Sequence, residues 1–147
     1  MRAGAVQIGG MDTTPPATTG SQRAKRLQSR LIEFGAECCV VVRGRHADFR
    51  RSHIAKQLVR SSTAPAAVCA EARQAESRRD FLHKMRVCLK ELRETAVWLR
   101  LAARERPAGN LDTLTHECSE LIAIFVASVK TAEANAHRQS NNPDRNR

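Results

Sequence analysis

The chain has 147 residues, a length that favours one domain, and its 25 Lys and Arg against 15 Asp and Glu give a net charge of +10. Aromatic residues make up only 3% of the sequence, which argues against β-sheets and against aromatic platforms for base stacking. No apolar run approaches the roughly 18 residues of a membrane span. The five cysteines, an odd number without secretory features, indicate reduced thiols in a cytoplasm. These features favour an α-helical, cytoplasmic protein.

The two ends of the chain lack helical periodicity. Residues 1–20 are rich in Gly, Pro and Thr and predict a disordered N-terminal segment. Residues 137–147 are polar and predict a disordered C-terminal tail. Residues 21–136 carry apolar side chains at helical spacing, and we expect them to form the single folded domain.

Two of the four predicted helices have regular apolar stripes. The first spans about residues 21–44, and its apolar side chains recur at steps of three and four between Leu27 and Val41. The third spans about residues 78–106, and its stripe runs from Phe81 to Leu99 with charged residues on the other face. Each pattern predicts an amphipathic helix with one face buried against its neighbours.

The second predicted helix, about residues 48–74, has a stripe of small residues that begins at Phe49 or at Ile54. Pro65 lies inside it and removes one backbone hydrogen-bond donor, so the segment is either a kinked continuous helix or two helices separated by a loop. We favour the continuous helix. Its small side chains would allow a neighbouring helix to approach closely.

The fourth predicted helix, about residues 111–136, is apolar nearly all round between Leu121 and Val129. A monomeric bundle covers only one side of such a helix, so this run predicts contacts between subunits. The candidate interface residues are Ile124 and Val126, together with Trp98 on the third helix. The alternative is that these side chains make no subunit contact, since single exposed aliphatic side chains are normal on a protein surface. Four helices with short connections predict an all-α fold, an antiparallel up-down four-helix bundle.

The sequence lacks the usual constellations of catalysis and of metal binding. No Glu-x-x-His pair of the kind found in dimetal bundles occurs, and His116 and Cys118 are poorly spaced for one helical face. The cysteines at 69, 88 and 118 lie on apolar stripes, where Cys usually serves as a small hydrophobic side chain. We therefore predict no enzymatic activity, no metal site and no cofactor.

Positive charge is concentrated in residues 21–60, which hold ten basic and three acidic residues. A concentrated basic region attracts a polyanion through its phosphates, with salt-sensitive and largely sequence-blind affinity. The candidate nucleic-acid-binding residues are Arg43, Arg45, Arg50, Arg51, Lys56 and Arg60. The alternative is a protein–protein scaffold whose positive charge is incidental.

Several stretches resemble a known family. They are residues 80–85 (Asp-Phe-Leu-His-Lys-Met), residues 89–99 (Leu-Lys-Glu-Leu-Arg-Glu-Thr-Ala-Val-Trp-Leu) and residues 117–132, which contain Glu-Leu-Ile-Ala-Ile. These stretches resemble the bacterial four-helix bundle proteins of the 23S rRNA intervening-sequence type, and the resemblance covers roughly residues 27–135. The chain departs from the family at Val68 and Cys69, where Asn-Tyr is common.

The resemblance implies an antiparallel four-helix bundle that assembles into a pentameric ring. The accessory variability determinant protein of diversity-generating retroelements looks like a relative, and it is a basic pentamer that binds nucleic acid and a reverse transcriptase. By that likeness we expect a homo-oligomer that binds nucleic acid, RNA before DNA, beside a reverse transcriptase. The resemblance carries no catalytic residues to this chain.

Overall fold

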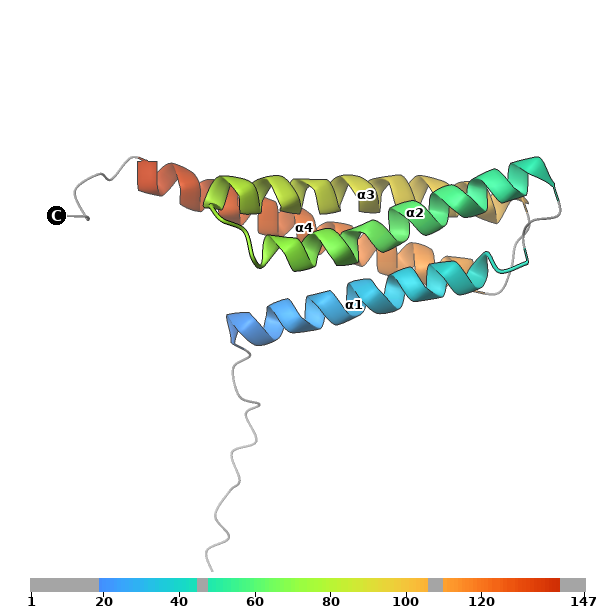
Figure 1. Cartoon of the computed structure of the whole chain (residues 1–147), viewed down its shortest axis with the longest axis horizontal. Helices are drawn as coiled ribbons and strands as arrows, with labels where there is room; N and C mark the ends of the chain where they lie inside the picture. The colour runs from blue at the N-terminus through green and yellow to red at the C-terminus, as the bar shows by residue number, and fades with distance from the viewer. Residues whose placement is uncertain (1–18, 45–47, 106–109, 141–147) are drawn as a thin grey trace, which may run out of the picture.

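The computed structural model describes residues 19–44, 48–105 and 110–140. Its helices are α1 (Gly20–Val41), α2 (Phe49–Ala72), α3 (Arg78–Glu105) and α4 (Leu111–Ser140). Consecutive helices run in opposite directions and lie side by side (Figure 1), and the described residues contain no strand. The predicted all-α, up-down four-helix bundle is confirmed.

Some predictions fall outside the described residues. These are the disordered state of residues 1–18 and 141–147 and the position of Arg45. At the other end of the domain, α4 continues to Ser140, beyond the end predicted at Ala136. No Gly or Pro interrupts residues 137–140, and His137 and Arg138 are basic side chains, which favour the C-terminal turn of a helix.

Side-chain caps define where two helices begin. At the start of α1, the Thr19 hydroxyl accepts the Gln22 N–H at 3.3 Å, while the Thr19 N–H donates to Gln22 Oε1 at 3.0 Å. This reciprocal capping box gives a hydrogen-bond acceptor to two backbone N–H groups at the start of the helix. The Asp48 carboxylate caps α2 by accepting the Arg51 N–H at 2.9 Å. Between them Gly44 adopts a positive φ of 75°, a conformation that glycine tolerates without strain.

The second helix is continuous through Pro65, as the favoured interpretation predicted. Small residues around the proline let α1 pack closely on α2. A side-chain carbon added at Gly35 of α1 would lie 3.1 Å from the carbonyl oxygen of Ser62. This contact is tight because α2 presents only small side chains there, and it explains why a glycine occupies the middle of α1.

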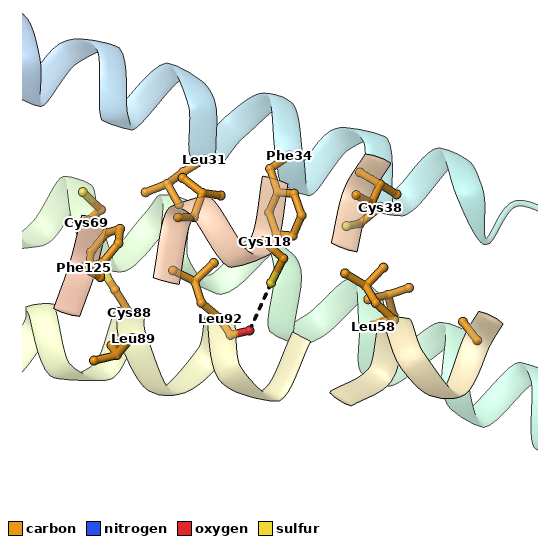
Figure 2. Close-up of a cluster of buried hydrophobic side chains, with 14 of the residues drawn as sticks. Leu31, Phe34, Cys38, Leu58, Cys69, Cys88, Leu89, Leu92, Cys118 and Phe125 are labelled. Carbon is orange, nitrogen blue, oxygen red and sulfur yellow. Dashed lines mark hydrogen bonds between the residues drawn. The ribbon is translucent and has the colours of Figure 1, made fainter. Parts of the chain in front are cut away.

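All four helices contribute to one hydrophobic core. The largest fully buried apolar side chains include Leu31 from α1, Leu58 from α2, Leu92 from α3, and Leu121 and Phe125 from α4. Figure 2 shows these helices converging on the cluster, with buried cysteines between the leucines. The structure also decides where the apolar stripe of α2 begins. Ile54 packs against the core, whereas Phe49 is 86% exposed.

Candidate nucleic-acid interface

The predicted nucleic-acid-binding residues begin at the turn after α1 and continue along α2. Arg43 is exposed in that turn, and Arg50, Lys56 and Arg60 are exposed on α2. Arg51 is half-buried. Because these side chains occupy several faces of one helix, their ability to bind an anion depends on which acidic groups already hold them.

Two of these cations are held by acidic partners. The Arg51 guanidinium lies 3.4 Å from the carboxylate of Asp48, on the same turn of α2. The Arg60 guanidinium lies 3.6 Å from the Glu91 carboxylate and also bonds to Glu94, both on α3. The hydrogen bond to Glu94 raises the pKa of Arg60, and the same bond lowers the pKa of Glu94. Arg51 and Arg60 are therefore already paired with carboxylates and are less available to bind a phosphate.

The other three described cations are more available. Arg50 is 76% exposed along its side chain, and its contact with Glu105 is long, at 4.0 Å. Arg43 and Lys56 are exposed and have no acidic partner among the residues that the structure describes. Exposed pairs at such distances add little stability, so a phosphate can replace the carboxylate beside Arg50 at small cost. We call Arg43, Arg50 and Lys56 the available cations.

A ring cluster lies on the same turns of α2 as Arg50 and Lys56. The rings of Phe49 and His53 on α2 are stacked, with centroids 6.5 Å apart and planes at 23°. The indole of Trp98 on α3 meets His53 edge-on, with centroids 5.6 Å apart. The low aromatic content argued against any aromatic platform, yet packing of α3 on α2 brings three of the few rings together. The four-residue spacing of Phe49 and His53 on one helix face was the available signal in the sequence.

A second basic region lies at the opposite end of α1. Arg23, Arg26 and Arg30 border a groove of about 530 Å³, and Arg73 at the end of α2 borders it as well. The Arg30 guanidinium makes two hydrogen bonds of 2.9 Å to the carboxylate of Glu117 on α4, and the bond to Glu117 raises the pKa of Arg30. The basic residues near the start of α1 and those around the α1–α2 turn therefore lie at opposite ends of the antiparallel pair α1 and α2.

The residues predicted to join subunits lie in different environments. Ile124 of α4 lines the groove, which residues of all four helices border, together with apolar residues such as Leu27 and Met85. Val126 is half-buried and packs against the core of its own chain. Trp98 contacts His53 of α2, and its indole N–H donates to Glu94 of its own helix at 3.2 Å. Their role in subunit contacts stays a prediction.

The buried thiols have the properties of structural side chains. Burial raises the pKa of Cys38, Cys88 and Cys118 to about 12. The Cys118 thiol donates to the carbonyl oxygen of Leu92 at 3.3 Å, the contact drawn in Figure 2. A thiol protonated at neutral pH is a poor nucleophile and a poor metal ligand. None of the five cysteines is in a disulfide.

Among the described residues, no cluster of three or more His, Cys, Asp or Glu side chains could hold a metal ion. Within that same part of the chain, no helix combines the length and apolarity needed to cross a membrane. The features described above in this part of the chain are the available cations, the ring cluster and the groove.

The geometry places the chain among small basic four-helix bundle proteins. The family model described as 23S rRNA-intervening sequence protein matches residues 26–127, and the chain belongs to this family. This confirms the resemblance seen in the sequence.

Solved structures share the fold. One of them is a crystal structure of a protein of unknown function from the S23 ribosomal protein family of Bacteroides thetaiotaomicron. The two proteins are 26% identical and superpose with a TM-score of 0.66, over 74% of this chain and 98% of that one. A search of proteins with curated functions finds no match. Neither the family model nor the solved structure points to an enzymatic activity.

Proposed function

We propose that the chain is a non-enzymatic protein that binds nucleic acid, RNA before DNA, through the basic surface at the α1–α2 turn and along α2. The observation that carries this proposal is the exposure of Arg43, Arg50 and Lys56 without strong acidic partners among the described residues, in a chain with a net charge of +10. Cations of this kind contact phosphates and release counterions, which yields affinity without sequence preference. Arg45 lies in sequence within the same basic turn and is expected to add to it.

A salt titration tests this function. Filter binding of a single-stranded RNA should show log K falling linearly with log salt concentration. Replacing Arg43, Arg50 and Lys56 with Ala should weaken binding and lower the magnitude of the slope by about 2, because each single-strand phosphate contact contributes about 0.7.

The matched control removes the same amount of charge elsewhere. Arg78, Arg79 and Lys130 are exposed cations near the other end of the bundle, and their replacement by Ala should leave the slope nearly unchanged. Equal losses in the two triple variants would show that only net charge matters. Absence of binding at low salt would contradict the function and leave the protein–protein scaffold.

A second proposal concerns assembly into a homo-oligomer, which the family resemblance describes as a pentamer. The supporting observation is the open groove bordered by residues of all four helices, where the half-buried Ile124 meets a largely apolar wall. In a cyclic ring each subunit uses two different faces, and the groove would supply one of them.

Light scattering tests the assembly. Ile124→Glu places a charge in the groove and should lower the measured mass, and Val126→Glu should act in the same direction. Ala123→Glu, on the exposed face of the same helix turn, is the control and should keep the mass of the wild type. A wild-type mass of one chain would contradict the assembly.

The same resemblance supports a further part of the proposal, a reverse transcriptase as the protein partner. The proposal also includes a cytoplasmic location, which the five free cysteines fit. Co-purification with the reverse transcriptase of the same genome tests this partner. A reverse transcriptase that does not co-purify at low salt would contradict it.

A further inference from the structure

The ring cluster of Phe49, His53 and Trp98 has an unusual distribution of exposure. Phe49 is 86% exposed, the largest exposure among the large apolar side chains of the described residues. His53 is also exposed, and Trp98 is half-buried and packed against the core. The cluster is therefore anchored at one end and open to solvent at the other.

The anchor is a network of hydrogen bonds on α3. Glu94 accepts the indole N–H of Trp98 at 3.2 Å and also accepts a bond from Arg60 of α2. These bonds link the two helices, and they limit rotation of the indole. Because Trp98 is held in place, the edge-on contact with His53 and the stack of His53 on Phe49 have a rigid base. A pre-organised surface binds a planar ligand with a smaller entropy cost than a mobile one.

The charges around the cluster favour an anionic ligand with planar groups. Arg50 follows Phe49 directly in the chain, and Lys56 lies three residues after His53, so both are on the same turns of α2 as the rings. Strands of unpaired nucleotides combine exposed planar bases with a negatively charged backbone. Proteins bind them with aromatic rings for the bases and cations for the phosphates.

We propose that the ring cluster is a stacking site for unpaired nucleobases, with the exposed face of Phe49 as its main contact. The site makes the chain prefer single strands to duplexes, since paired bases are already stacked on one another. This inference rests on the proposed function, because the phosphates beside the stacked base are held by the available cations. It adds a substrate class, single-stranded nucleic acid, that charge alone does not select.

The test compares Phe49→Ala with Phe49→Tyr on two ligands, a single-stranded RNA and a duplex RNA of the same length. Loss of one stacked base should weaken single-strand binding roughly 5- to 150-fold in the Ala variant. Duplex binding and the salt slope should stay unchanged, and the Tyr variant should keep wild-type affinity. Phe49 is exposed, so both variants should melt like the wild type.

A second readout comes from Trp98, the only tryptophan in the chain. Single-stranded RNA should change its fluorescence in the wild type, whereas duplex RNA should not. In Phe49→Ala the fluorescence change should require a correspondingly higher RNA concentration.

The outcomes separate this inference from the proposed function. Equal affinity of Phe49→Ala and wild type for single strands, with weakening only in the cation variants, would overturn the stacking site and leave the function standing. Absence of binding to either RNA would overturn both. A lower mass of Phe49→Ala in light scattering would assign the ring cluster to a second copy of the chain and would also overturn the stacking site.

Discussion

A pair of buried hydroxyl groups joins α2 to α3 and allows a quantitative test of how these helices pack. Ser61 and Thr95 are both fully buried, and their side-chain oxygens lie 3.0 Å apart. The Thr95 hydroxyl has two acceptors within reach, the Ser61 oxygen and, at 2.8 Å, the carbonyl oxygen of Glu91. The Ser61 hydroxyl in turn donates to the carbonyl oxygen of Leu58, over a long distance of 3.5 Å.

The two single substitutions should have unequal effects. Thr95→Val leaves the Ser61 hydroxyl buried with only the long contact to Leu58, and an unsatisfied buried group costs about 1–3 kcal/mol. Ser61→Ala leaves Thr95 bonded to Glu91 and should cost about 0.5–1.5 kcal/mol. Removing both hydroxyls leaves neither group unsatisfied. The double variant should therefore lie within about 1 kcal/mol of the wild type, below the sum of the two single effects.

Urea unfolding followed by circular dichroism measures these differences. All four proteins should be compared at one protein concentration, because association of the folded chain would shift the apparent stability. The slopes of the unfolding transitions should agree, so that changes in midpoint report stability. Additive effects within about 0.5 kcal/mol, or a larger effect of Ser61→Ala than of Thr95→Val, would refute this account of the hydroxyl pair.

Two further predictions concern the core. Since burial raises the pKa of Cys38, Cys88 and Cys118 to about 12 from an ordinary value of 9.0, these thiols ionise in the unfolded chain first. The contribution of these thiols to the free energy of unfolding should be fully present below pH 9 and should fall between pH 9 and 12, by at most about 4 kcal/mol per pH unit. Urea unfolding at several pH values measures this. A stability that does not change between pH 9 and 12 would contradict it. Gly35→Val should destabilise the fold by about 1–3 kcal/mol, because an added carbon lies 3.1 Å from a backbone carbonyl oxygen of α2. Thermal melting would measure this, with Gly20→Ala, which meets nothing within 4 Å, as the neutral control.

Much of the fold could be predicted because it depends on local patterns. Steps of three and four between apolar residues predicted four helices, and the structure contains them at nearly the same bounds. The continuity of α2 through Pro65 was predicted as well, since the flanking residues are compatible with a helix on both sides. The helix α4 ends later than its polar composition predicts, because a polar segment can stay helical where no Gly or Pro interrupts it.

The candidate site could be predicted only in part. Basic residues around the α1–α2 turn were visible in the sequence, but their pairing was not. Arg60 and Lys56 look alike in the sequence, yet Arg60 is held by Glu91 and Glu94 of α3, while Lys56 stands exposed. Such pairs join residues more than thirty positions apart, and their formation depends on how far α3 is shifted and rotated against α2.

The sequence by itself determined the class of fold, the placement of the cysteines in apolar stripes and the concentration of positive charge, because helical periodicity and net charge are properties of neighbouring residues. Only the tertiary structure decided that Phe49 faces solvent while Ile54 packs inward, and that Trp98 completes a ring cluster with His53. It also decided that α1 leaves a groove beside Ile124. The physical reason is that close packing selects one rotation and one register for each pair of helices, and this selection is made by the summed contacts of the whole core.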